Sequence, residues 1–178
     1  SCGLDFGTSN SGVALPVGES VRLLPLEDGS PSIPSAVFFA TDPPQAVTYG
    51  RAAMREYLDG TPGRLMRSLK SLLGSSLIDE MTAIGDRSIA FTDVLVLYLR
   101  MLRERAMAEA DAALDTVVLG RPVRFVDDDA VRDTKAQDTL ASCARAAGFR
   151  HIEFQFEPIA AAFDYERTIA REEAVLVI

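Results

Sequence analysis

The sequence lacks several features that would assign a function quickly. It has no tryptophan, one histidine and two cysteines in 178 residues. A Ser–His–Asp triad or a histidine-containing metal cluster would need His151, and no motif surrounds it. Cys2 and Cys143 stand far apart in the sequence, so there is no CxxC pair and no disulfide framework. We therefore expect His151 to be a structural or surface residue and both cysteines to be small core residues.

Long apolar runs and basic stretches are also missing. No apolar run approaches the roughly 18 residues that a membrane-spanning helix needs. The net charge is −8, and no stripe of Lys and Arg with interleaved aromatic residues is present. These two absences argue against a membrane partner and against a nucleic-acid partner, which needs a basic face. The chain starts without a basic and then apolar leader, and with its unpaired cysteines this predicts a cytoplasmic protein.

What is present is the composition of a globular domain. Apolar residues make up 48% of the chain and charged residues 25%. Hydrophobic periodicity and turn residues predict strands over 2–6, 13–17, 21–26, 36–40, 47–49, 115–119, 150–156 and 174–178. They predict helices over 51–58, 64–73, 92–113, about 130–147 and about 158–170. A strand meander followed by strand–helix crossovers predicts an α/β fold with a mixed sheet and flanking helices.

Helix ends carry their own signals. Thr92 or Asp93 is expected to cap the helix over 92–113, and the run Asp127–Asp129 the helix that follows it. The acidic run lacks the alternating oxygen ligands of a calcium loop, which favours the capping interpretation. Gly74 is expected to end the helix over 64–73 as a glycine just past its last turn.

The first candidate for chemistry is the turn after the first strand. Asp5 stands near the strand end, where a carboxylate can bind Mg²⁺ directly or through water. Gly7 can adopt a positive φ, and Thr8, Ser9 and Asn10 then present consecutive backbone N–H groups that suit a phosphate. Taken alone, the same residues also fit an ordinary hairpin turn.

Two further residues could act on a phosphate. Lys70 lies among apolar positions, where its ammonium could offset charge that develops on phosphate oxygens. Glu157 stands at a strand-to-helix junction beside Pro158, and it could orient or deprotonate an attacking water. Each also has an ordinary interpretation, Lys70 as a solvated helix charge and Glu157 as an acid that complements the helix dipole.

The order and spacing of these segments together resemble a known family. The segments are GLDFGTS at 3–9, IPSAV at 33–37, LKSLLG at 69–74, VVLGRPVRF at 117–125, AGF at 147–149 and EPIAAA at 157–162. They resemble the DnaK heat-shock chaperone family of the actin-like ATPase superfamily, most closely its YegD-like branch. The resemblance runs in order from Gly3 to Ile178.

The resemblance implies an actin-like ATPase fold, in which this chain is the ribonuclease H-like first lobe. Residues 1–36 and 114–171 would form the ribonuclease H-like subdomain. Residues 37–113 would form a smaller α+β subdomain inserted into it. Residues 172–178 would form the first strand of a second lobe.

The resemblance also implies cofactors and roles. The cofactors would be ATP or ADP with Mg²⁺, and the parent protein would hydrolyse ATP to ADP and phosphate. Asp5 would help to bind Mg²⁺, and the loop Gly7–Asn10 would contact the phosphates. Lys70 would stabilise the phosphoryl transition state, and Glu157 would position water and Mg²⁺ ligands. Ser9 and Asn10 differ from the usual family residues, so their side-chain contacts are expected to differ.

The end of the chain leads to further expectations. It stops at Ile178, where the family's second phosphate loop begins. The resemblance therefore implies a fragment that hydrolyses ATP negligibly by itself. Its terminal strand would lack partners and could associate with another molecule. Unfolded-protein clients or co-chaperones would bind through other regions.

Two alternative functions stay open at this point. Actin-like filament ATPases also carry an early D-x-G-T and a later E-P-x-A-A-A, although the LKSLLG segment and the G-R-P strand argue against this class. A pseudo-ATPase scaffold, which binds nucleotide and partners without turnover, has the same sequence signals as an active enzyme.

Overall fold

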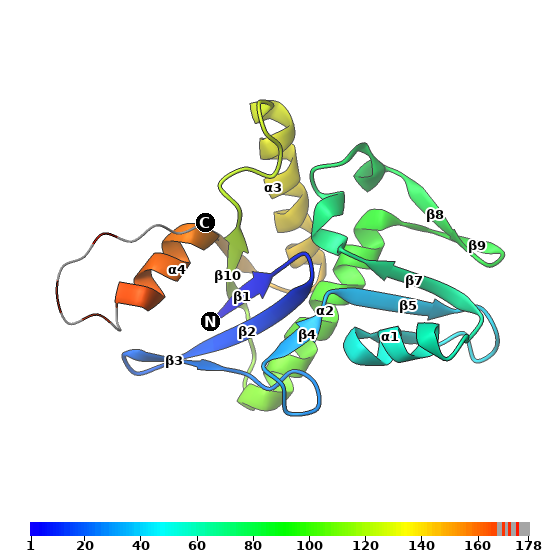
Figure 1. Cartoon of the computed structure of the whole chain (residues 1–178), viewed down its shortest axis with the longest axis horizontal. Coiled ribbons are helices and arrows are strands. Elements are labelled where there is room, and N and C mark those ends of the chain that lie inside the picture. Colours follow the sequence, from blue (N-terminus) through cyan, green and yellow to red (C-terminus); the bar gives the residue numbers. More distant parts are fainter. Residues whose placement is uncertain (167–168, 170, 172–173, 175–178) are drawn as a thin grey trace.

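The main sheet is mixed, as the sequence predicts. The computed structural model describes residues 1–166, 169, 171 and 174. The strands of this sheet are β1 (Cys2–Phe6), β2 (Asn10–Val17), β3 (Ser20–Leu23), β4 (Ser32–Pro34), β10 (Thr116–Arg121) and β11 (His151–Phe156). They run in the order β11–β10–β1–β2–β3, and β4 pairs with β2. β1, β10 and β11 run parallel to one another, and β2 runs antiparallel to β1 (Figure 1).

A second group of elements lies on the other side of the molecule from β3 and the last helix (Figure 1). It contains a sheet of β5 (Ala36–Ala40), β6 (Val47–Tyr49) and β7 (Gly63–Arg67), with β5 in the centre, and helix α1 (Gly50–Leu58). A hairpin of β8 (Met81–Ile84) and β9 (Arg87–Ala90) extends beyond it. Two short 3₁₀ helices, η1 (Leu69–Leu72) and η2 (Ser76–Asp79), lead from β7 to this hairpin.

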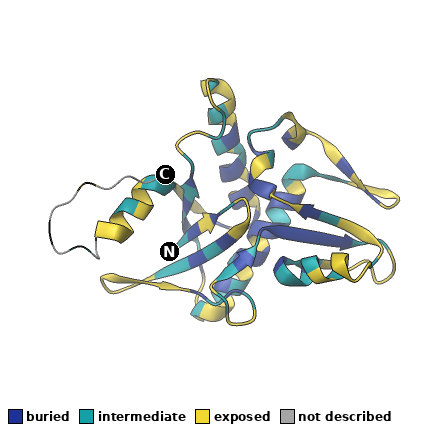
Figure 2. Cartoon of the chain, viewed as in Figure 1, coloured by how far each residue is buried: buried dark blue, intermediate teal, exposed yellow. Residues whose placement is uncertain are grey.

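Two long helices form the core with the main sheet. α2 (Phe91–Ala110) buries Tyr98, Leu99 and Leu102 completely, and α3 (Ala130–Ala146) packs beside it. Their apolar side chains share one core cluster with Leu4 of β1 and Leu119 of β10. Figure 2 shows this buried centre surrounded by exposed loops and helix faces.

The last helix is packed differently. α4 (Glu157–Glu166) begins where β11 ends, and Pro158 lies in its first turn as predicted. It buries none of its residues, and Phe163 is 60% exposed. The predicted helix extends to about residue 170; the structure gives α4 over Glu157–Glu166, and residues 167, 168 and 170 lie outside the described residues. The strand expected over 174–178 lies, apart from Ala174, outside the described residues.

Three local predictions are wrong. The segment over 64–73 is the strand β7 followed by the 3₁₀ helix η1, because β7 pairs along the length of β5, from Ala36↔Arg67 to Ala40↔Gly63. Ser68 between them has a φ of 55°, which breaks any continuous right-handed helix. The residue that precedes α2 is Ala90, which makes no side-chain cap, so neither Thr92 nor Asp93 caps this helix. Asn10, expected in the turn with Thr8 and Ser9, is already the first residue of β2, where it pairs with Pro34 of β4.

Two other local predictions are confirmed. The Asp129 side chain accepts a hydrogen bond from the Arg132 backbone N–H at 3.0 Å and so caps α3. Cys2 and Cys143 are both buried free thiols, and burial raises the pKa of each to about 11.

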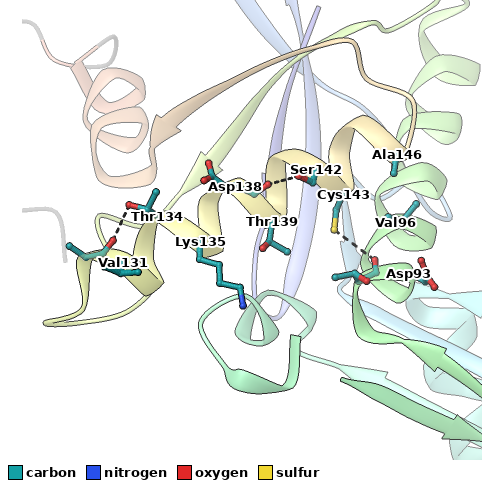
Figure 3. Close-up of a pocket in the computed structure, with 12 residues that line it drawn as sticks. Asp93, Val96, Val131, Thr134, Lys135, Asp138, Thr139, Ser142, Cys143 and Ala146 are labelled. Atoms are coloured by element: carbon teal, nitrogen blue, oxygen red, sulfur yellow. Dashed lines mark hydrogen bonds between the residues drawn. The ribbon is translucent and has the colours of Figure 1, made fainter. Parts of the chain in front are cut away.

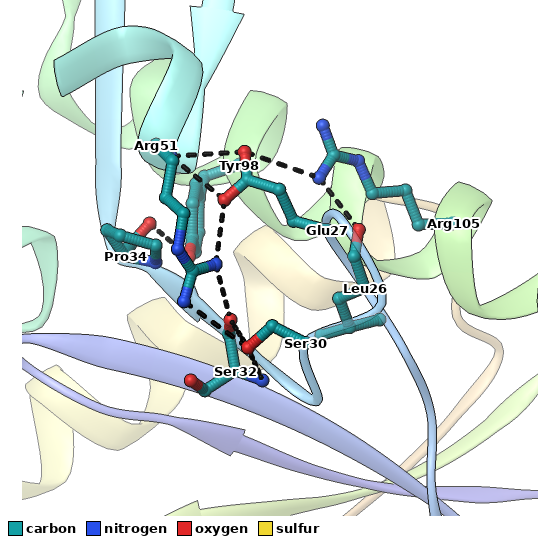
Figure 4. Close-up of polar contacts among 8 residues, drawn as sticks. All are labelled: Leu26, Glu27, Ser30, Ser32, Pro34, Arg51, Tyr98 and Arg105. Carbon is teal, nitrogen blue, oxygen red and sulfur yellow. Dashed lines mark hydrogen bonds and ion pairs between the residues drawn. The ribbon is translucent and has the colours of Figure 1, made fainter. Parts of the chain in front are cut away.

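A buried carboxylate joins the two groups of elements (Figure 4). The Glu27 side chain is only 7% exposed, and its oxygens accept hydrogen bonds from the Arg51 backbone N–H at 2.9 and 3.0 Å. The Arg51 guanidinium also donates to Glu27 at 3.1 Å, and Arg105 of α2 lies 3.9 Å from it. Glu27 therefore fixes the start of α1, where a carboxylate also complements the helix dipole, against the loop that follows β3.

Candidate phosphate-binding site

The loop between β1 and β2 is a tight turn that needs glycine at its start. A Cβ atom on Gly7 would lie 2.2 Å from the Asn10 carbonyl oxygen, which is closer than any side chain tolerates. The Ser35 hydroxyl donates to the Gly7 carbonyl at 2.7 Å, and the Ser35 N–H donates to the Ser9 carbonyl at 2.9 Å. Both carbonyl oxygens therefore accept a hydrogen bond from Ser35, which weakens their repulsion of an anion held elsewhere on the loop.

Hydrogen bonds between buried hydroxyl groups hold this loop against the core. The Ser11 and Ser35 hydroxyls lie 2.9 Å apart, and both residues are 2% exposed. Tyr98 of α2 donates its hydroxyl to the Pro34 carbonyl at 3.0 Å. Burial raises the pKa of Tyr98, and hydrogen bonding with Ser11 and Ser35 partly offsets this rise. The loop thus has a fixed link to the core helix α2.

Lys70 reaches this loop from the second group of elements. It lies in η1, it is 8% exposed, and its Nζ forms an ion pair with Oε1 of Glu157. The two residues are 87 positions apart in the chain. The fold therefore brings together the two residues that the sequence singles out as catalytic.

The carboxylates of Asp5 and Glu157 lie on either side of Gly120. Asp5 is on β1, Gly120 on β10, and Glu157 directly follows β11, so all three lie toward the carboxyl ends of neighbouring parallel strands. Ligands of open α/β sheets bind at this edge. A Cβ atom on Gly120 would lie 3.6 Å from Glu157 Oε1 and 3.8 Å from Asp5 Oδ1. The missing side chain lets the two carboxylates approach each other.

The charges at this edge suit a divalent cation. Burial raises the pKa of Asp5, the negative charge of Glu157 raises it further, and the Lys70 ammonium opposes both. Mg²⁺ prefers one or two carboxylates and keeps several waters, and a bound cation would relieve the repulsion between Asp5 and Glu157. The residues present therefore fit Mg²⁺. Within the described residues there is no cluster of three or more His, Cys, Asp or Glu side chains arranged to bind a metal.

A pocket of about 460 Å³ opens beside these residues. It is lined by Gly7, Thr8, Lys70, Ser71, Gly74, Ser75, Pro122, Arg124, Phe125 and Glu157. Asp5 and Asn10 instead line an adjacent hollow of about 560 Å³, which shares Glu157 with the first pocket. Ser9 lines neither of the two. The expected phosphate-loop residues are thus divided between two adjacent spaces, with Glu157 on the boundary.

Several pocket residues are ones that sequence reasoning missed. Ser71 and Ser75 follow Lys70, and Arg124 and Phe125 come from the loop after β10. Gly74 brings these segments together, because a Cβ atom there would lie 2.7 Å from the Phe125 carbonyl oxygen. It does not have a positive φ, so its predicted role as a helix-ending glycine is wrong, and it permits close approach of two loops instead.

A larger hollow of about 960 Å³ lies between α2 and α3 (Figure 3). Lys135 lines it, and its ammonium is paired with Asp79 of η2. Cys143 also lines it, with its Sγ 3.8 Å from the Thr92 carbonyl, and its raised pKa keeps the thiol protonated and unreactive. Although this hollow is larger than the pocket between Gly7 and Glu157, its ammonium is already paired and its thiol is protonated, so it offers fewer groups that could bind or act on a ligand.

Comparison with known proteins found a distant similarity. No protein-family model matches the chain. The chain is 25% identical over 184 residues to the chaperone protein HscA homolog of Rickettsia bellii (strain RML369-C). This match covers 92% of the chain and 27% of that protein, so the chain spans about a quarter of the relative's length. The chain is thus distantly similar to part of a chaperone protein. In the described part of the chain, no helix combines the length and apolar character needed to cross a bilayer.

Proposed function

We propose that this chain is the first lobe of the nucleotide-binding domain of a DnaK-like chaperone, and that its pocket binds the phosphates of Mg-ATP. The Lys70–Glu157 ion pair beside the Gly7–Thr8 turn is the observation that carries this proposal. A cation, a carboxylate and a glycine turn from distant parts of the chain converge on one pocket. They are the groups that phosphoryl transfer to water requires.

The proposed fold is the actin-like, ribonuclease H-like first lobe. The mixed sheet with helices α2 and α3 is compatible with it. We propose that residues 1–36 and 114–171 form one subdomain and residues 37–113 the inserted one. The G-R-P sequence at 120–122 favours the YegD-like branch.

Each site residue has a proposed task. The loop Gly7–Asn10 holds phosphate oxygens through its backbone, and Lys70 places positive charge where negative charge develops. Glu157 orients the attacking water and accepts its proton. Asp5 would hold Mg²⁺, which would neutralise phosphate charge when bound. The proposal includes ATP hydrolysis by the whole protein. It also includes the binding of clients or co-chaperones through regions outside this chain.

Equilibrium titration of this chain with Mg-ATP tests the binding step. Lys70→Ala should weaken binding by at least about tenfold, the scale of one lost charged hydrogen bond. Lys135→Ala is the matched control, because it removes the same charge from the α2–α3 hollow. Equal weakening by both variants, or no binding by the wild-type chain, would overturn the proposal.

Single-turnover hydrolysis by the whole protein tests the catalytic step. Lys70→Ala should lower the rate about a hundredfold or more, as the loss of one transition-state contact does. Binding without turnover in the wild-type protein would identify a nucleotide-binding scaffold in place of an ATPase.

A further inference from the structure

Arg124 is a second cation of the phosphate pocket that the sequence pattern does not reveal. Among the described residues that line this pocket, the charged ones are Lys70, Arg124 and Glu157. Lys70 is already paired with Glu157, so the two together carry no net charge. A polyphosphate that enters the pocket therefore meets Arg124 as the positive charge that no other residue of the pocket wall neutralises, since its ion-pair partner Asp128 does not line this pocket.

The backbone on both sides of Arg124 is fixed by a buried ion pair. Arg121 is 8% exposed and donates to Asp133 at 2.9 Å and to the Val123 carbonyl at 3.2 Å. Asp133 also accepts a hydrogen bond from the Phe125 backbone N–H. The Arg121 guanidinium lies over the Phe125 ring, 5.1 Å from its centroid. Residues 123 and 125 are thus both held, and the main chain of Arg124 between them has a defined position.

The Arg124 side chain, in contrast, has little to hold it. It is 59% exposed, and its Nη1 lies 3.7 Å from Oδ1 of Asp128, whose side chain is 98% exposed. An ion pair between two exposed side chains contributes little and exchanges readily with other partners. The pair with Asp128 is one contact between Nη1 and Oδ1, whereas a phosphate can accept two N–H groups of the guanidinium at once, which makes phosphate the stronger partner here.

We propose that Arg124 binds the terminal phosphates of the ligand in this pocket and that Asp128 competes with the phosphate for its guanidinium. This inference rests on the proposed phosphate-binding function and adds a residue to it. Ligand binding transfers Arg124 from Asp128 to the phosphate. Asp128 is then a residue that weakens binding, and its effect acts entirely through Arg124.

Calorimetric titration of the chain with inorganic tripolyphosphate and Mg²⁺ tests this inference. Arg124→Ala should weaken binding by about tenfold, the scale of a lost charged hydrogen bond. Asp128→Asn should strengthen it by about threefold, because the competing exposed ion pair is weak. In the double variant the gain from Asp128→Asn should vanish.

Two matched variants control for net charge. Arg150→Ala removes an exposed arginine at the opposite end of β10 and β11, near Asp115, and Asp127→Asn removes an exposed acid next to Asp128. Arg150→Ala should change the affinity for tripolyphosphate less than Arg124→Ala does, and Asp127→Asn should change it less than Asp128→Asn does. An Arg124→Ala effect no larger than that of Arg150→Ala overturns the inference, as does an Asp128→Asn gain that persists without Arg124. Failure of the wild-type chain to bind tripolyphosphate and Mg-ATP would instead overturn the proposed function, and this inference with it.

Discussion

Replacing Asp133 by asparagine isolates the charge of the Arg121–Asp133 pair. Asparagine keeps the size of the side chain, but its NH₂ group must face either the Arg121 guanidinium or the Phe125 N–H, both of which are donors. The two side chains are only 10% and 19% exposed. Breaking a buried ion pair from one side costs about 3–5 kcal/mol. The Gln137 side chain and the Val123 carbonyl still accept hydrogen bonds from Arg121 in the variant. We therefore expect Asp133→Asn to lower the free energy of unfolding by about 2–3 kcal/mol.

The pH dependence of this loss of stability gives a second measurement. The hydrogen bond from Arg121 lowers the pKa of Asp133 below the ordinary value of an aspartate. The folded chain therefore holds this proton less tightly than the unfolded chain, so the stabilisation is complete above the unfolded pKa. It is lost as the pH falls through the folded pKa. The difference between wild type and Asp133→Asn should be constant from about pH 7 to pH 5 and should shrink below about pH 4.

Urea unfolding followed by circular dichroism at several pH values measures both effects. Asp138→Asn removes the same charge from an exposed position on the same helix and serves as the control. A loss below about 0.5 kcal/mol, the range of ordinary surface substitutions, would show that the charge pair does not stabilise the fold. So would a loss that stays the same down to the lowest pH at which the chain is folded.

Three further substitutions test other parts of the structure. Glu27→Gln should lower the free energy of unfolding by about 2 kcal/mol, because the buried carboxylate pairs with Arg51. Hydrogen exchange should also show faster opening of α1. Unchanged exchange in α1 would contradict the role given to Glu27. Asp5 has a raised pKa, so its ionised form costs stability as the pH rises through that pKa. Asp5→Asn should therefore raise stability at pH 7, by no more than about 1 kcal/mol after screening by water; a loss in thermal unfolding at pH 7 would show that the carboxylate stabilises the fold. Ser35→Ala should cost about 1–2 kcal/mol, because it leaves the Gly7 carbonyl without this donor, and exchange at residues 7–10 should quicken; equal protection in both proteins would rule out this support of the loop.

The sequence predicts the main sheet well because its signals are local. β1 and the segment around Val117 are short, mainly apolar runs, and the segment around Phe154 alternates polar with apolar residues; each forms a strand. Asp129 is a helix cap whose partner lies three residues away. Such features depend on neighbours in the chain, which a sequence displays directly.

The errors arise where a distant partner decides the structure. The leucines over 64–73 have helical spacing, yet β5 needs a neighbouring strand, and pairing with β7 overrides the local preference. Gly74 resembles a helix-ending glycine, whereas its role is contact with Phe125, fifty-one positions later in the chain. Buried charge pairs such as Arg121 with Asp133 carry no sequence signal, because each residue alone is typical of a surface.

The candidate site shows the same division. Asp5, Gly7 and Glu157 stand at strand ends, and parallel strands bring such positions to one edge. The approach of Lys70 depends on η1, a short element that the helix prediction did not contain. Arg124 belongs to the site only because the loop after β10 faces the loop around Gly74.

Nuclear magnetic resonance titration with tripolyphosphate and Mg²⁺ shows directly where a polyphosphate binds. The largest shifts of backbone amide signals should occur at Gly7, Thr8, Ser71 and Gly74, which line the pocket beside Lys70 and Glu157. Shifts concentrated at Thr139 and Cys143 in the α2–α3 hollow, or spread evenly over the surface, would contradict the proposed phosphate-binding site.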